Sequence, residues 1–597
     1  MKKKTLLLML FVATFTWLGS AQTTTTWEKA NPFAAPAWNP VPPDYTMDVI
    51  IDADYLFEDG FIANSLTINA GKTVSIGGTV LTGDAKSIGV VGNFTNNGSI
   101  VLGGDASFVQ FGTMTTGAGA TYKVIRESSD YLEYDYIFYS SPTTTATVNS
   151  AFVNATGSSV NHIFTLDTSA FNDADNDMYD DDAEGSEWVS VTDPNAALQA
   201  GVGYIVLGSH SDLPFDASGI DTGNTYTDIV EFTGPFNNGD ITVSVTQDAL
   251  STDNSNNLNL LGNPYPSAID LNVFKNDNDA HLNGKFYFWT HNTQLVPVAG
   301  YGYVYTNDDY SLYNANVGAG TAAASGGATP DKYLPSCQSF LAEVKASGTS
   351  VTFKNTQRDL ANNGGFMSPL EEDDDKIWLN MLGDNGDFRQ IFVGFFDEAT
   401  DGFDDFDSIR LENGENTDFY SVIEGVDSHI AIQGAHTFNI DKVIALGLEI
   451  VQEGEYTISI DNFEGVFADG QEIYIYDNAT GAIHDLATGG YVFTAAIGEV
   501  DDRLELRFKS TVSTDEAVLD FVGVYPNPSD AIFNISWRGA TNANIQVYDL
   551  SGKVIISSTI NNVDRTYKLD MSQYNTGFYF VELSVDNYKV VKKLVLK

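Results

Sequence analysis

The stretch that decides the fold at one end of the chain is Ile545–Ile555, IQVYDLSGKVI. Its apolar residues lie on both sides of Asp549-Leu550-Ser551-Gly552, where the glycine is free to take a positive φ, so the pattern predicts two antiparallel strands and a tight hairpin. Asp586-Asn587 predicts a second turn. Seven short apolar runs follow one another here: Val524-Tyr525, Ile532–Trp537, Ile545–Tyr548, Val554–Ser558, Thr566–Leu569, Phe578–Leu583 and Val590–Leu596. Residues 523–597 are therefore predicted to form a compact antiparallel β-sandwich.

Four pieces of this segment follow one another in a characteristic order: VYPNPS (524–529), IQVYDLSGKVI, LDMSQYNTGFYFVEL (569–583) and KVVKKLVLK (589–597). Together they resemble the type A C-terminal sorting domain of the type IX secretion system of Bacteroidetes. The resemblance implies an immunoglobulin-like sandwich that engages the secretion machinery and is cut off after export. The residues that carry the sorting signal would be Tyr525, Pro526, Asn527, Pro528, Tyr548, Asp549, Gly552, Gly577, Tyr579, Lys592 and Lys593.

The amino end predicts a signal peptide over residues 1–21. Met1–Lys4 is basic, Leu6–Leu18 is apolar, and Gly19-Ser20-Ala21 offers small residues for cleavage. The apolar core is shorter than the roughly 18 residues of a membrane span, and no later segment of the chain reaches that length. The sequence thus predicts passage to the periplasm and then, through the C-terminal domain, export to the outer cell surface or the medium.

Charge separates the body from its tail. The chain has 29 basic and 80 acidic residues, a formal net charge of −51, whereas residues 523–597 carry 8 basic and 6 acidic ones. This argues against a nucleic acid as partner, since phosphate binding needs clustered Lys and Arg. One cysteine, Cys337, excludes an intrachain disulfide framework and is expected to be a small buried hydrophobe. Residues 511–522 are predicted to be the linker before the tail.

The body is predicted to be all-β. Residues 22–45 are rich in Pro and Thr, which predicts an extended linker or a leading strand. Residues 46–125 hold short alternating strands broken by Gly-Gly pairs and by the turn Asn97-Gly98, which favours small parallel β-solenoid coils, with a plain β-meander as the alternative. Residues 126–370 predict an aromatic, Asn-rich all-β domain of the sandwich type, and residues 371–510 a β-sandwich with a turn at Asp469-Gly470.

Several stretches of the body, among them NLLGNPYPSAID (259–270), GKFYFWTHNT (284–293) and EGEYTISIDNFEG (453–465), resemble a domain of large flavobacterial surface proteins that end in type IX sorting signals. The resemblance covers most of residues 46–510. It implies an extracellular, all-β, cell-surface product and names no biochemical activity.

Calcium is the one cofactor that the residues suggest. Counted from Asp173, carboxylates stand at positions 1, 3, 5, 9 and 12 of an acidic stretch, a spacing that can supply the six to eight oxygens that calcium takes. Met178 replaces the glycine of a helix–loop–helix site, so a looser calcium loop or a solvated acidic loop are the alternatives. The candidate ligands are Asp173, Asp175, Asp177, Tyr179, Asp181 and Glu184. A second cluster, Asp397–Asp407, lacks the spacing and predicts a charged edge.

Catalytic motifs are missing from the sequence. It has no GxSxG, HExxH or P-loop, and its seven histidines stand singly, so no catalytic residue is assigned and no enzymatic activity is predicted. Carboxylate pairs from distant strands stay open for a polysaccharide hydrolase. Dense aromatic stretches are interpreted first as sandwich core, with a sugar platform at Trp289 and Tyr303 as the alternative. The sequence predicts a structural or adhesive surface protein, with a lectin-like protein and a secreted hydrolase as alternatives, and surface glycans or other cell-surface proteins as partners.

Overall fold

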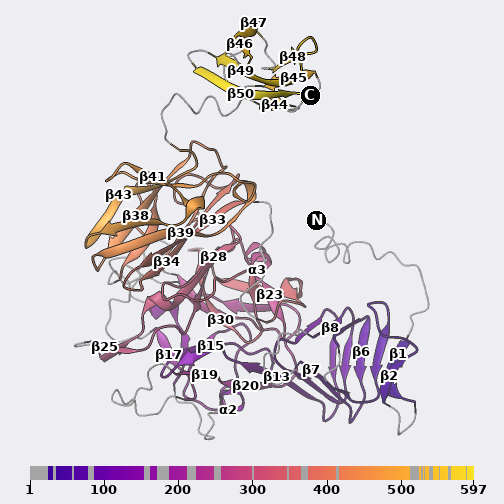
Figure 1. Ribbon diagram of the computed structural model, residues 1–597. Helices are drawn as coiled ribbons and strands as arrows, with labels where there is room; N and C mark the ends of the chain where they lie inside the picture. Colours follow the sequence, from indigo (N-terminus) through magenta and orange to yellow (C-terminus); the bar gives the residue numbers. More distant parts are fainter. Residues whose placement is uncertain are drawn as a thin grey trace. The chain divides into compact units, whose positions relative to one another are not determined.

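Strands dominate the computed structural model of the chain (Figure 1). It describes residues 24–30, 35–56, 59–77, 86–152, 162–170, 187–210, 224–247, 257–298, 302–345, 348–364, 374–411, 416–510, 523–525, 529, 531–536, 542–549, 552–561, 566–585 and 588–597. The α-helices of this part are short, α2 (Val148–Ala151) and α3 (Leu271–Asp277). The predicted all-β class is confirmed. In the part of the chain so described, no helix has the length and apolarity that a membrane span requires.

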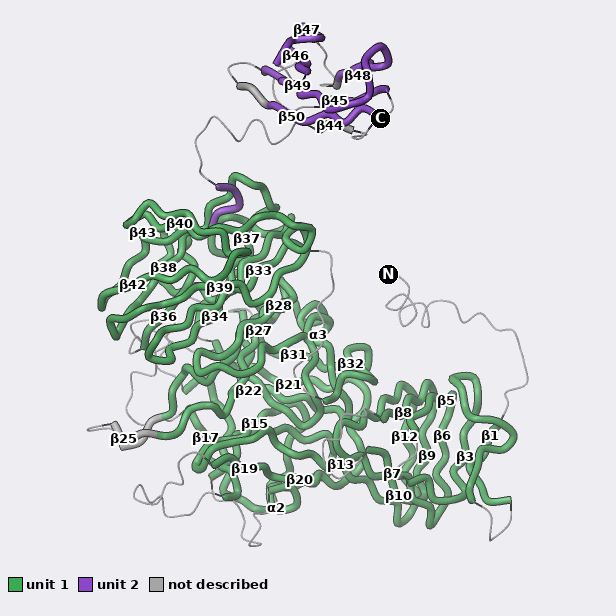
Figure 2. The backbone as a smooth tube through the Cα atoms, in the orientation of Figure 1, with its two compact units in different colours: residues 1–506 green, residues 507–597 purple. Residues whose placement is uncertain are grey.

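The chain divides into two compact units, residues 1–506 and 507–597 (Figure 2). The division falls just before the predicted linker, whose residues 511–522 lie outside the described ones. Residues 1–506 form one unit, so the boundaries that the sequence places inside the body stay predictions.

The body begins with a parallel β-solenoid (Figure 1), which confirms the prediction of coils over the meander. Successive coils stack parallel strands on three faces, with registers such as Leu66↔Phe94 and Ile100↔Tyr122. The first face holds β3 (Asp48–Ile51), β6 (Ser65–Ile68), β9 (Phe94–Asn96) and β12 (Met114–Thr116). The second holds β4 (Tyr55–Leu56), β7 (Thr73–Ile76), β10 (Ser99–Leu102) and β13 (Thr121–Glu127), and the third β5 (Phe61–Ala63), β8 (Ser87–Val90) and β11 (Ser107–Gln110).

Local sequence explains the coils. Alternate residues such as Leu66 and Phe94 point inward and are fully buried, and their neighbours on the strands face out. Gly98 is required because a Cβ there would lie 2.2 Å from the Lys72 carbonyl oxygen of the preceding coil. The outer end of the first face is capped by β1 (Thr24–Lys29), which pairs in parallel with β3 and antiparallel with β2 (Pro36–Asn39).

Two larger sheets follow and pack face to face. The four-stranded sheet contains β15 (Tyr136–Tyr139), β16 (Ile163–Leu166), β17 (Trp188–Ser190) and β18 (Tyr204–Leu207). The five-stranded sheet contains β22 (Leu258–Gly262), β24 (Leu282–Trp289), β27 (Tyr310–Asn314), β28 (Ala319–Thr321) and β30 (Ser339–Val344). Phe138 and Ile205 of the first sheet share one apolar cluster with Leu260 and Leu341 of the second.

The solenoid is bound to these sheets by paired strands and by a buried arginine. β13 pairs antiparallel with β20 (Ile229–Thr233). Arg358, from the short strand β32 (Arg358–Asp359), is 5% exposed and donates to the carbonyls of Phe108 and Gln110 on β11. Its remaining donors meet the side chains of Ser267, Asn238 and Asn355, and its guanidinium lies 4.7 Å from the ring centre of Tyr265.

Short strands complete the middle of the body. They are β14 (Tyr131–Leu132) with β19 (Thr225–Tyr226), β21 (Ile241–Ser244) with β31 (Ser350–Phe353), β23 (Ala268–Asp270) with β29 (Tyr333–Leu334) and β32, and β25 (Val296–Val298) with β26 (Gly302–Val304).

An eleven-stranded sheet ends the body. Its members are β33 (Asp375–Gly383), β34 (Phe388–Phe396), β35 (Ser408–Ile409), β36 (Asp418–Val422), β37 (Ile430–His436), β38 (Val443–Ile450), β39 (Gly454–Glu464), β40 (Tyr474–Asp477), β41 (Ala482–Asp485), β42 (Tyr491–Ala495) and β43 (Gly498–Arg507). Gly470 has φ +100°, as the predicted Asp469-Gly470 turn needs. The pairing of β34 with β37 is parallel.

The C-terminal unit is the predicted small sandwich. β44 (Gly523–Tyr525), β45 (Ile532–Ser536) and β48 (Thr566–Asp570) form one sheet. β46 (Asn542–Tyr548), β47 (Val554–Asn561), β49 (Gly577–Val585) and β50 (Tyr588–Leu596) form the other. Its core joins Phe533 and Leu569 to Ile545 and Leu583. The seven apolar runs of the sequence therefore correspond to seven strands.

Candidate functional site

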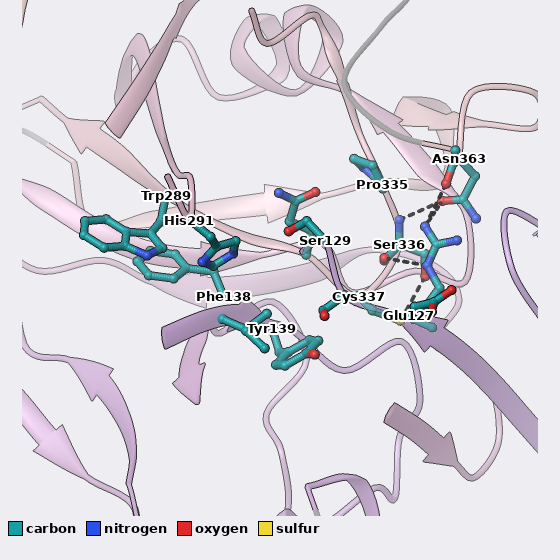
Figure 3. A pocket seen from close by; sticks show the side chains of 15 residues that line it. Glu127, Ser129, Phe138, Tyr139, Trp289, His291, Pro335, Ser336, Cys337 and Asn363 are labelled. Atoms are coloured by element: carbon teal, nitrogen blue, oxygen red, sulfur yellow. Dashed lines mark hydrogen bonds between the residues drawn. The ribbon is translucent and has the colours of Figure 1, made fainter. Parts of the chain in front are cut away.

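A pocket of about 260 Å³ opens in the body between the four- and five-stranded sheets (Figure 3). Its floor is buried, whereas Ser129 and Gly364 at its rim are exposed. Its lining residues come from the end of β13 and the residues after it, from β15, from the end of β24 and the residues after it, from the segment before β30, and from residues 363–364. They are Arg126, Glu127, Ser128, Ser129, Ile137, Phe138, Tyr139, Trp289, His291, Pro335, Ser336, Cys337, Gln338, Asn363 and Gly364.

One wall of the pocket is held by the buried carboxylate of Asp135. The Trp289 indole N–H donates to Asp135 Oδ1 over 2.9 Å, and His291 Nδ1 lies 3.1 Å from Oδ2. A carboxylate only accepts hydrogen bonds, so His291 must donate from Nδ1, and in the neutral ring Nε2 is left as an acceptor. Figure 3 shows the His291 ring beside Trp289 and Phe138 at this wall.

Two tyrosines line or adjoin the same wall. Tyr139 is 4% exposed, and its hydroxyl, beside Ser128, makes no hydrogen bond of ordinary distance and angle. Burial raises the pKa of Tyr139 well above its ordinary value, so the hydroxyl stays protonated. Behind it, the Tyr131 hydroxyl donates to Asp228 Oδ1 over 3.0 Å and lies 3.1 Å from His210 Nδ1.

The opposite wall is built on Arg126, which is 7% exposed. Its guanidinium donates to the backbone carbonyls of Gly104, Ser336 and Asn363 and lies 3.8 Å from Asp105. The guanidinium donors are therefore used in hydrogen bonds to the protein itself. Burial lowers its pKa from the usual value.

A thiol and a carboxylate are the groups at this pocket with the best-known reactive chemistry. Burial raises the pKa of the Cys337 thiol to about 11, which leaves it protonated and a poor nucleophile at neutral pH. Asp135 is occupied by two side chains and by the Tyr136 N–H. The lining also offers His291 Nε2, the hydroxyls of Tyr139 and Ser129, and the carboxylate of Glu127.

Of the two residues predicted to bind a sugar, one lies at this pocket. Trp289 lines the pocket, but as a half-buried ring: its plane lies 8° from that of Phe138, with 6.3 Å between the ring centres, and it meets Tyr310 edge-on at 4.9 Å. That packing against the core cluster is what the core interpretation expects, and it does not give the flat exposed platform of the alternative. The side chain of Tyr303 lies outside the described residues.

Sequence reasoning missed His291, Asp135, Tyr139 and Arg126. His291 was set aside as a single histidine without a partner, and its partner stands 156 positions away. The available signal was the dense stretch Phe286–Asn292, which does contribute both Trp289 and His291.

The predicted calcium ligands Asp173, Asp175, Asp177, Tyr179, Asp181 and Glu184 all lie outside the described residues. In the second acidic cluster, Asp401 is paired with Lys442, and Asp407 is fully buried and accepts the backbone N–H groups of Asp404 and Gly434. Burial raises the pKa of Asp407 to about 7. Within the described residues, no group of three or more His, Cys, Asp or Glu is arranged to hold a metal ion.

A buried ion cluster around Asp418, which the sequence did not predict, lies inside the eleven-stranded sheet. Asp418 on β36 is fully buried, with Arg410 Nε at 3.1 Å, Arg389 Nε at 3.3 Å and His429 Nδ1 at 3.0 Å. Burial alone would raise its pKa, but Arg410, His429 and Arg389 hold the pKa of Asp418 well below its usual range. The Tyr420 ring stacks on His429 with 3.7 Å between ring centres. These residues rigidify the sheet and do not line the pocket.

The sorting-signal residues are placed as follows. Gly552 has φ +81°, and Asp549 accepts its N–H over 3.0 Å and that of Lys553 over 3.1 Å, so the predicted hairpin is confirmed. Gly577 begins β49, and the Tyr579 hydroxyl donates to the Asn575 carbonyl. Tyr548 ends β46, Lys592 and Lys593 lie on β50, and β44 ends at Tyr525. Pro526, Asn527, Pro528 and the Asp586-Asn587 turn lie outside the described residues.

Two family descriptions match the chain. Residues 16–508 match "Domain of unknown function (DUF8693)", and residues 523–597 match "Secretion system C-terminal sorting domain". The chain is 28% identical over 161 residues to an endo-acting ulvan lyase of Formosa agariphila, a match that covers 24% of this chain and 31% of that protein. It is 29% identical over 100 residues to the ulvan lyase NLR42 of Nonlabens ulvanivorans, covering 16% and 18%.

The chain thus spans less than a third of the length of these relatives. Among solved structures, the BSP domain of a biofilm-associated protein aligns with 79% of this chain and 66% of that one, at 9% identity and a TM-score of 0.12. That score is too low to relate the two folds.

Proposed function

The chain belongs to the DUF8693 family of domains of unknown function and is a cargo of the type IX secretion system, and from this premise we propose that its body is a structural and adhesive module without catalytic activity of its own. Its sorting domain directs export to the cell surface or secretion and implies contact with the secretion machinery. The organisms that use this route are Bacteroidetes.

The observation that carries the proposal is the way the body is joined into one unit. Arg358 binds β11 of the solenoid to the middle sheets through two carbonyls, and Arg126 binds Gly104 of the solenoid to Ser336 and Asn363. Buried guanidinium groups with several protein acceptors hold elements in a fixed geometry. A body of this kind is suited to bear load between two surfaces.

Bead adhesion under flow tests the proposal. The full chain is coupled to beads, which are passed over surfaces coated with polysaccharides or with the same protein, beside albumin-coated beads as control. Retention of the protein-coated beads on at least one surface, with that surface chemically unchanged afterwards, is the expected result. Retention no greater than that of the albumin beads on every surface contradicts an adhesive role.

The two ulvan lyase relatives favour a second candidate function, the cleavage of a polysaccharide. Such cleavage can proceed by elimination, as in a lyase, or by hydrolysis, as in the hydrolase alternative of the sequence analysis. Incubation of the full chain with ulvan separates it from the first candidate. A lyase creates an unsaturated chain end that absorbs in the ultraviolet, and a hydrolase creates reducing ends without that absorbance. Either product above the level of a boiled sample supports an enzyme and rejects the non-catalytic proposal.

A further inference from the structure

We propose that the pocket between the four- and five-stranded sheets binds one neutral sugar residue. This goes beyond the adhesive role and does not depend on it, because a bead can adhere through other surfaces. The site has a closed floor, an exposed rim and a volume of about 260 Å³. That volume lies below the roughly 300–1,000 Å³ of pockets for drug-sized ligands, so it suits a single ring rather than a chain.

The polar groups of the pocket indicate a ligand that both donates and accepts hydrogen bonds. His291 Nε2 accepts because Asp135 holds the proton on Nδ1. The buried Tyr139 hydroxyl makes no regular hydrogen bond, and a buried hydroxyl left in that state costs free energy that a ligand hydroxyl would recover. Sugar hydroxyls can serve both groups, since each donates one hydrogen bond and accepts others.

The apolar part of the wall completes the match. Ile137, Phe138, Trp289 and Pro335 line the pocket beside those polar groups. A sugar ring has apolar C–H edges between its hydroxyls, and such an alternation of apolar and polar surface fits a wall of this composition.

Charge selects a neutral sugar over an acidic one. The only cation of the lining, Arg126, is engaged by three backbone carbonyls and faces Asp105, and Glu127 stands near the rim. The chain as a whole carries a net charge of −51. A carboxylate on the ligand would thus meet repulsion on approach and no free guanidinium inside.

Saturation-transfer NMR on the full chain tests the site. The probes are glucose, galactose, mannose, rhamnose and N-acetylglucosamine, with glucuronate and galacturonate as the acidic counterparts of the first two. We expect transfer to at least one neutral sugar and weaker transfer to the uronates. Absence of transfer to all five neutral sugars, or stronger transfer to a uronate than to its neutral counterpart, overturns the proposal.

Two variants localise the binding. Tyr139→Phe removes only the hydroxyl. It should raise the dissociation constant about three- to tenfold, which is the range of one neutral hydrogen bond. Ser129→Trp places a large ring on the exposed rim, where folding does not depend on it, and should abolish transfer. Tyr456→Phe, which removes a hydroxyl bonded to the Gln452 carbonyl on the eleven-stranded sheet, is the matched control and should bind as the wild type does. Unchanged binding by Ser129→Trp rejects this pocket as the site.

Discussion

Replacement of Arg358 by methionine should weaken the junction between the solenoid and the rest of the body. Met is of comparable length and apolar, so the change removes the five N–H donors with little loss of volume. It leaves the carbonyls of Phe108 and Gln110 without the guanidinium in a region where both residues are about 1% exposed. At about 1–3 kcal/mol for each buried acceptor left unpaired, the two cost about 4 kcal/mol.

The corresponding shift in melting temperature follows from the size of the unit. Unfolding entropy is about 2.1 cal/mol/K per residue near 60 °C, so a unit that spans residues 1–506 has an unfolding entropy of about 1 kcal/mol/K. The first transition of the full chain should therefore fall by about 4 °C in differential scanning calorimetry. Burial lowers the pKa of Arg358 to about 10, so the wild-type side chain is a cation at the neutral pH of the assay.

Two further variants separate charge from geometry. Arg358→Lys keeps the charge but offers three donors from one atom, so it should lose most of the same stability. Lys123→Met, on the surface beside the exposed Glu231, is the control and should shift the transition by less than about 1 °C, because exposed ion pairs contribute about 0–1 kcal/mol. A melting temperature of Arg358→Met within about 1 °C of wild type would refute the reasoning.

Three shorter predictions concern other regions. A chain without residues 523–597 should accumulate in the periplasm, and its normal recovery outside the cell, by immunoblotting of fractions, would contradict the assigned export route. Asp418→Asn should cost about 3–5 kcal/mol at pH 7, since it leaves two buried arginines without their carboxylate. Because the pKa of Asp418 is depressed, the stability from its charge is present above about pH 4 and lost as the pH falls below it, so urea midpoints of variant and wild type should converge there. Calcium should raise the melting temperature of wild type but not of Asp175→Asn/Asp177→Asn, and an equal rise in both would reject the predicted calcium loop.

Patterns of short range were predictable from the sequence. The alternation around Leu66 and Phe94, and the Asn97-Gly98 turn, arise from neighbours within one coil, and they specified the solenoid. The hairpin at Asp549–Gly552 was equally local, since the turn residues and both strands lie within residues 542–561.

The pocket could not be predicted in the same way. Asp135 directly precedes β15 and His291 follows β24, so the two meet only after the two sheets have packed, and no local pattern encodes that contact. Trp289 was found because aromatic density is visible in the sequence, but its half-buried state depends on Phe138, 151 positions earlier. The parallel pairing of β34 with β37 was missed for the same reason, as 30 or more residues separate the paired positions.

The antiparallel strand β2 at the end of the first solenoid face has a consequence for the length of the molecule. A parallel coil exposes a ready template for another coil, and growth or end-to-end association stops where a strand of opposite direction and a proline occupy that template. Because the cap ends the solenoid at that side, the number of coils can change without a change in the sheets that follow the solenoid. Whole coils away from β11, such as the 17 residues between Ile50 and Thr67, can be inserted or removed in register while the junction at Arg358 stays unchanged. The solenoid is in this sense a spacer whose reach is adjustable in steps of one strand spacing, about 4.8 Å.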